Sequence, residues 1–184
     1  MQPEPRYYEF REKHQKSQQF QAYLERIIRS RWPNVQRIEQ ASERCDKDGT
    51  DYWVYLSSGN KYSIDLKVRE QDYAKKPRPH GGDDLALETW SVIPKQGNPG
   101  KIGWTRDITK RTDYVVWYWI DTQRFFIVSF PILCRIFRKH WNQWREQYKT
   151  APQNSGAWKS ECTFVPRSLL EEKIRTWGHG RLKD

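Results

Sequence analysis

The first third of the chain is patterned as one helix followed by strands. Between residues 8 and 31 there is no Gly or Pro, and apolar side chains recur every three or four positions. This spacing is typical of an amphipathic helix, and Pro33 ends it. A short apolar segment at 35–38 favours a first strand. Two β-rich runs, 51–56 and 61–69, flank a turn of Ser, Ser, Gly and Asn, which predicts a β-hairpin.

The middle of the chain alternates basic loops with apolar strands. Residues 71–84 contain Pro, Gly, Lys, Arg and His, which favours a mobile basic loop, and 85–93 is patterned as a strand. Residues 94–112 are again rich in Gly, Pro, Lys and Arg. The apolar runs 114–120 and 124–130 then predict a second hairpin around a short polar turn.

The last third predicts a long helix, a short strand and a second helix. Pro131 suits the first turn of a helix that runs to about residue 148 along an apolar stripe. We expect a linker at 150–159, a strand at 162–166, a helix at 168–177 and a frayed tail at 178–184. The order of elements predicts a single α/β (α+β) domain over residues 1–184 with a mostly central sheet.

Charge and composition indicate the class of partner. The 184 residues carry 33 Lys and Arg against 23 Asp and Glu, a formal charge of +10, which favours a polyanionic partner. The 10 Trp, 10 Tyr and 7 Phe exceed what one small core needs, and exposed rings can stack on bases. No apolar run is long enough to cross a bilayer and no signal peptide begins the chain, so we expect a cytoplasmic protein without membrane attachment. The three cysteines lack zinc-ligand spacing and are expected to be reduced thiols.

The first hairpin carries the residues that best fit a chemical role. Asp51 opens its first strand, and Asp65 and Lys67 lie two apart on the second. Strand periodicity places Asp65 and Lys67 on one face of the sheet surface while Ile64 and Leu66 point into the core. Hairpin pairing can bring Asp51 alongside them. Two carboxylates and a lysine can hold a hard cation and orient a nucleophile, although a simple cross-strand salt bridge is the other interpretation.

The spacing Gly49-Thr50-Asp51, 13 residues, Asp65-Leu66-Lys67 resembles the active-site signature of the PD-(D/E)XK nuclease superfamily. The resemblance covers roughly residues 8 to 150. It implies a restriction-endonuclease-like fold, a central mixed sheet flanked by helices, and a Mg²⁺-dependent, or Mn²⁺-dependent, endonuclease that cuts DNA. It further implies that Asp51, Asp65 and the Leu66 carbonyl bind the metal and that Lys67 positions or activates the attacking water. Thr50 stands where the family name has a proline.

Further carboxylates are candidates for the same site. Glu88 lies in an otherwise apolar strand, where a charge is costly to bury without a cation, so it is either a catalytic metal ligand or the partner of Arg69 or Lys67. Many members of the superfamily also use a Glu of the first helix, for which Glu12 and Glu25 are the candidates.

Asp46 and Asp48 precede Gly49 in the manner of a calcium loop. The ligand spacing breaks at the strand that follows, so we expect no EF-hand.

The expected partner is DNA, with RNA as the alternative polyanion. Its contacts are expected from loop and strand-end residues, with Trp104 as a stacking side chain: Arg69, Lys75, Lys76, Arg78, Lys101, Trp104, Arg106, Lys110 and Arg111. A homodimer would suit a duplex because one site cuts one strand, and the resemblance suggests a bacterial or phage origin. Two rival hypotheses are a nuclease-like protein that binds nucleic acid without cutting it and a small adaptor that binds another protein.

Overall fold

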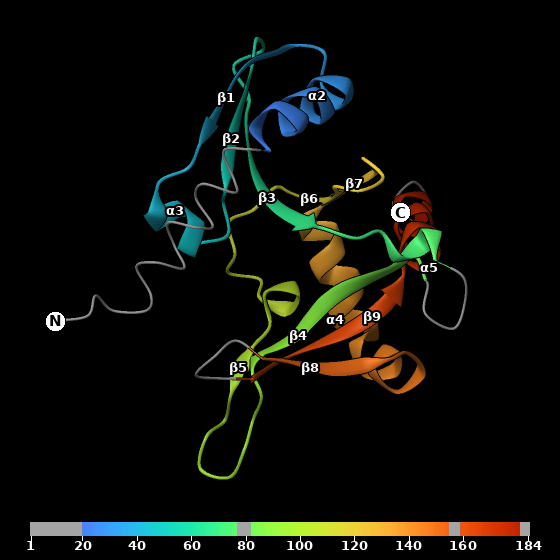
Figure 1. Ribbon diagram of the computed structural model, residues 1–184. Coiled ribbons are helices and arrows are strands. Elements are labelled where there is room, and N and C mark those ends of the chain that lie inside the picture. Colours follow the sequence, from blue (N-terminus) through green and yellow to red (C-terminus); the bar gives the residue numbers. More distant parts are fainter. Residues whose placement is uncertain (1–19, 77–81, 155–158, 181–184) are drawn as a thin grey trace, which may run out of the picture.

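Two β-sheets share the long helix α4 (Phe130–Gln147) in the computed structural model, which describes residues 20–76, 82–154 and 159–180 (Figure 1). Side chains at 46–47, 154 and 178–180 are outside the description as well. The described residues form a single α+β domain. The first sheet has five strands in the order β1-β2-β3-β6-β7, and the second has four in the order β5-β4-β9-β8.

Both predicted hairpins are present in the first sheet. Strand β2 (Tyr52–Leu56) pairs antiparallel with β3 (Lys61–Arg69), and β6 (Tyr114–Trp119) pairs antiparallel with β7 (Phe125–Ser129). Strand β1 (Val35–Gln40) adds to the free edge of β2. The two hairpins meet through β3 and β6, which run parallel, so the sheet is mixed.

Both faces of the first sheet are buried. Helix α2 (Gln21–Arg31) covers one face with Leu24, Ile27 and Ile28, and α4 covers the other. The alternation of β6 divides its side chains between two cores, with Val116 on the α2 side and Trp117 on the α4 side. A central strand buried on both faces accounts for the nearly continuous apolar sequence of β6.

The second sheet was not expected from the sequence. Strand β4 (Asp84–Val92) pairs with β9 (Lys159–Pro166) and with the short β5 (Lys101–Ile102). The prediction of a linker at 150–159 is wrong for its first half, because β8 (Thr150–Asn154) pairs with β9. Its polar sequence lacks a strand signal, and pairing with an established strand overrides that weak local preference. Its Pro152 is tolerated because β8 lies at the edge of the sheet.

The long helices lie where the sequence predicted them, but their first and last residues differ from the predicted ones. Helix α4 begins with Pro131 in its first turn, as expected, and α5 (Arg167–Gly180) continues into the segment predicted to be a frayed tail. Residues 181–184 and the predicted helical residues 8–19 lie outside the described part of the chain. Three short helices were not predicted: α3 (Glu43–Lys47), η1 (Tyr73–Lys75) and η2 (Trp104–Arg106). None of the helices in the described ranges is both long and apolar enough to cross a membrane.

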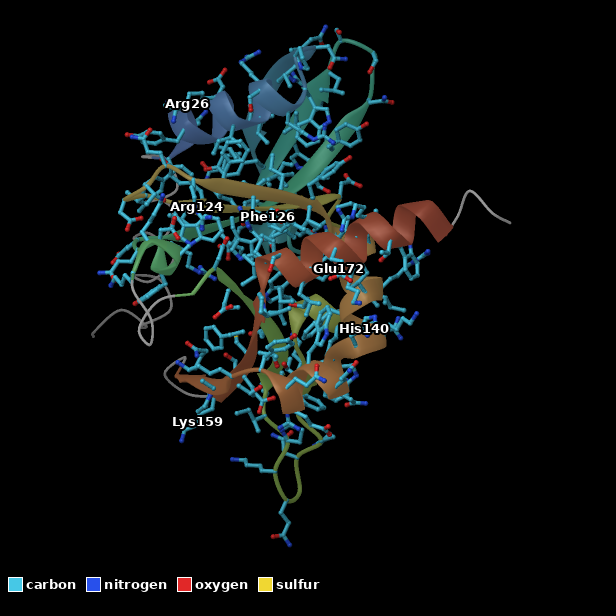
Figure 2. All side chains as sticks on the ribbon, turned by 90° about the vertical axis from the view of Figure 1, so that its right-hand side faces the viewer. Arg26, Arg124, Phe126, His140, Lys159 and Glu172 are labelled. Atoms are coloured by element: carbon cyan, nitrogen blue, oxygen red, sulfur yellow. The ribbon has the colours of Figure 1, made fainter. Side chains whose placement is uncertain are left out.

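An ion-pair network anchors the connection from the first sheet to the second. Asp72 and Asp83 lie between β3 and β4, and both accept hydrogen bonds from the guanidinium of Arg124, next to β7 (Figure 2). Arg167, at the start of α5, also pairs with Asp83 at 3.0 Å. The network holds the connection between β3 and β4 in place. These two strands carry residues of the candidate site.

Candidate active site

The hairpin register brings Asp51 to Asp65 and Leu66. Tyr52 lies opposite Ile64, and the N–H of Asp51 donates to the Ile64 carbonyl at 2.8 Å. The Asp51 carboxylate then accepts the N–H of Leu66, with 2.6 Å between Oδ2 and N. Just before β2, Asp51 therefore bonds to β3 through both its backbone N–H and its side chain. The second bond holds the Asp51 carboxylate beside the Asp65-Leu66 peptide.

Asp65 and Lys67 lie on one face of β3, as strand periodicity predicted. The Lys67 Nζ is 2.6 Å from Asp65 Oδ1. The expectation that this face is an open sheet surface is wrong, because Asp65 and Lys67 are in register with Val115 and Trp117 on the α4 side. Asp65 is only 6% exposed. The pair therefore lies inside a covered site, which distinguishes it from an ordinary solvent-exposed salt bridge.

The surroundings of Lys67 keep it charged. Its ammonium lies 5.0 Å from the centre of the Trp104 ring. Burial lowers the pKa of Lys67, but the charges of Asp65 and Asp51 and the hydrogen bond to Asp65 together outweigh burial, so the pKa lies above its usual value. The two carboxylates therefore favour the charged form of Lys67.

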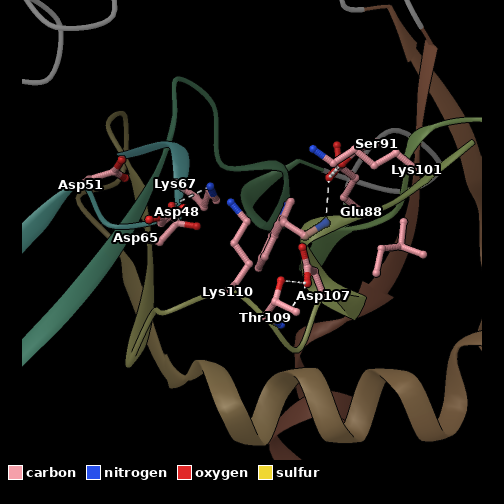
Figure 3. A pocket seen from close by; sticks show the side chains of 13 residues that line it. Asp48, Asp51, Asp65, Lys67, Glu88, Ser91, Lys101, Asp107, Thr109 and Lys110 are labelled. Carbon is pink, nitrogen blue, oxygen red and sulfur yellow. Dashed lines mark hydrogen bonds and ion pairs between the residues drawn. The ribbon is translucent and has the colours of Figure 1, made fainter. Parts of the chain in front are cut away.

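These residues line a pocket of about 310 Å³ between the two sheets (Figure 3). The pocket has five carboxylates and three lysines, an excess of two negative charges in a chain whose formal charge is +10. Its lining comprises Asp48, Gly49, Asp51, Asp65, Lys67, Glu88, Ser91, Lys101, Ile102, Trp104, Asp107, Thr109 and Lys110. A concentration of carboxylates in a basic protein favours a bound cation.

Glu88 lies in the same pocket but comes from β4 of the second sheet. Its Oε2 accepts the Ser91 hydroxyl at 2.8 Å and the Trp104 N–H at 3.0 Å. Among the described residues it forms no ion pair with Lys67 or Arg69, so that interpretation is wrong. Figure 3 places Glu88 across the pocket from Asp51 and Asp65. Glu88 ties η2 to β4, and this bond positions the Trp104 ring.

Two carboxylates of the pocket were missed as site residues. Asp48 precedes Gly49, whose φ of +94° turns the chain from α3 into β2. In the sequence, Asp48 stands out only as part of a segment that resembles a calcium loop. Asp107 follows η2 and accepts the N–H and hydroxyl of Thr109 at 2.9 Å and 2.6 Å. It is 42 positions from Asp65, and no local pattern marks it as a neighbour.

Three of the predicted nucleic-acid contacts line the pocket. Lys101 and Lys110 line it, with Lys110 on the side of Lys67 and Lys101 on the side of Glu88 (Figure 3). Trp104 also lines it, although its ring packs 6.2 Å from Trp117 and 6.1 Å from Phe130, centre to centre. The ring is a wall of the pocket and not the free stacking side chain that was predicted.

Other predicted contacts lie elsewhere. Lys75 and Lys76 are exposed at η1, where Lys76 donates to Gln71, and neither lines this pocket. Arg69 and Arg111 are exposed but are likewise not part of its lining, and the Arg111 carbonyl accepts the hydroxyls of two residues near Asp51. Arg78 lies outside the described residues.

The donor set near Asp51 fits a hard divalent cation. Asp51 and Asp65 supply carboxylate oxygens. The Leu66 N–H donates to Asp51, and the carbonyls of alternate strand residues share a side, so the Leu66 carbonyl points toward the edge beyond β2. These three oxygen donors fit Mg²⁺, which retains several waters. The described ranges contain no group of three or more His, Cys, Asp or Glu side chains placed to hold a metal, so Glu88 is not preassembled with them.

The first-helix glutamate does not join this set. Glu25 of α2 pairs with Arg29 at 2.8 Å, on a helix that covers the opposite face of the sheet from Asp65. The suggestion that Glu25 is a site residue is therefore wrong, and Glu12 lies outside the described residues.

Comparisons of the chain with family models, with curated proteins and with solved structures gave no match.

Proposed function

We propose that the protein is a Mg²⁺-dependent endonuclease that hydrolyses DNA phosphodiester bonds, built on a restriction-endonuclease-like variant of its α+β fold. The observation that carries the proposal is the convergence of Asp51, Asp65 and Lys67 at one end of the β2–β3 hairpin. A binding module has no need to bury the Asp65 carboxylate and to half-bury Asp51 beside one lysine, because burying charge is costly. A phosphodiesterase needs this set.

Each residue has a distinct role in the proposed reaction. Asp51, Asp65 and the Leu66 carbonyl would hold Mg²⁺, which when bound supplies Lewis-acid polarisation of the phosphate and makes water more acidic. The Leu66 N–H fixes the orientation of the Asp51 carboxylate. Mn²⁺ has similar ligand preferences and is expected to substitute.

The geometry of Lys67 favours the role of a donor. Its Nζ lies 2.6 Å from Asp65 Oδ1, and an ammonium group offers N–H donors and no acceptor. One of its three N–H groups is directed to Asp65, and the others can donate to a phosphate oxygen or orient the water. Lys67 therefore positions the nucleophile and balances the charge that develops on the phosphate.

DNA is the proposed substrate because lysines line the same pocket as the carboxylates. Lys101 and Lys110 would contact backbone phosphates on either side of the scissile bond. RNA offers the same phosphates, so it is the comparison substrate.

The test is cleavage of supercoiled, linear, branched and single-stranded DNA, and of RNA, with Mg²⁺, Mn²⁺ or EDTA. We expect cleavage that requires the metal and falls by about 100-fold or more in Asp65→Ala and Lys67→Ala. Glu172→Ala and Lys159→Ala remove the same charges from exposed positions outside the pocket and should cut like the wild type. The proposal is lost if the wild type cuts none of these substrates, or if both pocket variants cut as well as it does.

A DNA-binding protein without catalysis is the second candidate function. It is favoured by the ion pair itself, since Lys67 already neutralises Asp65 without a metal. Its signature in the same experiment is tight DNA binding without strand cleavage under any metal.

A further inference from the structure

A second pocket adjoins the first along η2. It has a volume of about 280 Å³ and is lined by Ile102, Arg106, Arg138 and Trp141. Ile102 lines both pockets, and η2 presents Trp104 to the first and Arg106 to the second. The two pockets are therefore neighbouring parts of one surface.

The guanidinium of Arg106 is held in a fixed plane. Its Cζ lies 3.8 Å from the centre of the Trp141 ring and 4.7 Å from that of Trp90. The two rings are nearly perpendicular, at 88°. Its Nη1 donates to the Thr89 carbonyl at 3.2 Å, which is its one hydrogen bond within the described residues. A guanidinium has five N–H donors, so a fixed fork remains for a bound anion.

The charge of this second pocket is not compensated. Its lining contains two arginines and no carboxylate. The nearby Arg145 differs, because Glu161 accepts two hydrogen bonds from it at 3.0 Å each. Burial and the charges of Arg138 and Arg145 lower the pKa of Arg106, which indicates that these cations repel one another. An anion placed between Arg106 and Arg138 would relieve this repulsion.

We propose that the second pocket binds a backbone phosphate of the same DNA whose scissile phosphate occupies the first pocket. The identity of the ligand as DNA rests on the function proposed above. The chemistry favours a phosphate because a planar guanidinium recognises phosphate oxygens with two parallel hydrogen bonds, and Arg138 adds a second cation at the opening. The DNA strand would thus cross η2, with Arg106 and Arg138 fixing its direction over the catalytic residues.

The test is DNA binding without cleavage, measured as fluorescence anisotropy of a labelled duplex in EDTA over a series of salt concentrations. Arg138→Ala removes one exposed cation from the pocket, and Arg175→Ala removes one from an exposed position on α5 as the matched control. Each phosphate contact contributes about 0.9 to the slope of log K against log salt. We expect the slope of Arg138→Ala to fall by about one and its affinity deficit to shrink about threefold between about 50 mM and 200 mM salt.

The outcomes separate this site from the proposed catalysis. A slope for Arg138→Ala equal to that of the wild type and of Arg175→Ala overturns the phosphate site, even if the enzyme cuts DNA. If the wild type cuts nothing but the salt slope of Arg138→Ala falls by the expected amount, the phosphate site stands and the nuclease proposal fails. Thermal unfolding of each variant checks that the exposed substitutions leave the fold unchanged.

Discussion

Replacing Arg124 by Met should strongly destabilise the protein, because it removes the counter-ion of a buried carboxylate. Asp72 is 1% exposed. It accepts hydrogen bonds from Arg124 Nε at 2.6 Å and Nη2 at 2.9 Å, and also from the Thr122 hydroxyl and the Ala74 N–H. Arg124→Met keeps most of the aliphatic stem and leaves Asp72 with two of these four donors.

The size of the loss follows from this geometry. Removing one partner of a buried ion pair costs about 3 to 5 kcal/mol, because the remaining charge stays away from water. Arg124 also donates to Asp83 at 3.2 Å and 2.8 Å, but Asp83 is about a third exposed and contributes less. The side chain of Arg124 is itself about a quarter exposed, which places the expected loss at the lower end, about 3 kcal/mol.

The effect should depend on pH with a defined sign. Burial raises the pKa of Asp72. The hydrogen bonds from Arg124, Thr122 and Ala74, together with the Arg124 charge, lower it by more than burial raises it, so the folded pKa lies below its usual value. A lowered folded pKa stabilises the fold above the unfolded value of about 3.9, and this stabilisation is lost as pH falls through the folded value. The advantage of wild type over Arg124→Met should therefore be complete at neutral pH and shrink on strong acidification.

Urea unfolding, followed by tryptophan fluorescence at several pH values, measures both effects. Arg37→Met is the matched control, because Arg37 pairs with Glu39 at 3.2 Å where both side chains are about half exposed. The control should change the unfolding free energy by no more than about 0.5 kcal/mol. A loss below about 1 kcal/mol for Arg124→Met at neutral pH, or a loss that does not shrink in acid, would refute the reasoning.

Three further predictions concern the site and its strands. Gly49→Ala should lower stability by about 1 to 2 kcal/mol in the same assay, because its φ is +94° and a Cβ would lie 2.9 Å from the Thr112 hydroxyl; unchanged stability would contradict the turn. Burial, and to a smaller extent the negative charge of Glu88, raise the pKa of Cys162 to about 11. The Cys162 thiol should therefore resist alkylation by iodoacetamide at pH 8 in the folded protein and react once the protein is unfolded, as measured by mass spectrometry of its peptides; equal alkylation in both states would contradict this. Mg²⁺ at about 100 times its dissociation constant should stabilise the wild type by about 2.7 kcal/mol, and Asp65→Asn should abolish the thermal shift; an equal shift in both would place the metal elsewhere.

Local patterns predicted the two hairpins and the face shared by Asp65 and Lys67. The turn residues and strand alternation are encoded within a few positions of one another, so they can be read directly. The position of Asp51 beside Asp65 could also be predicted, because it depends only on the register of one hairpin. The burial of the Asp65 and Lys67 pair could not be predicted, because it depends on α4 and η2 covering that face of the sheet.

The second sheet could not be predicted for the same reason. Glu88 was correctly expected near the acidic residues and lines their pocket, but the contacts of its carboxylate with Ser91 and Trp104 depend on the register of β4 with β9 and on η2. Strand β8 carries no alternation of its own and exists because β9 offers an edge. Such long-range pairings depend on how distant segments meet, and no short window of sequence contains that information.

If the protein is the proposed nuclease, the charges of the two pockets suit two different steps of its reaction. The first pocket holds an excess of two negative charges, so a DNA phosphate can enter it favourably only together with a cation. The second has two arginines and no carboxylate, so it can hold a phosphate without any metal. Because η2 joins them, DNA held at Arg106 and Arg138 would already lie beside Asp51 and Asp65 when Mg²⁺ arrives. Binding and cleavage would then be separable steps, with affinity set mainly by the arginines and chemistry by the β2–β3 hairpin.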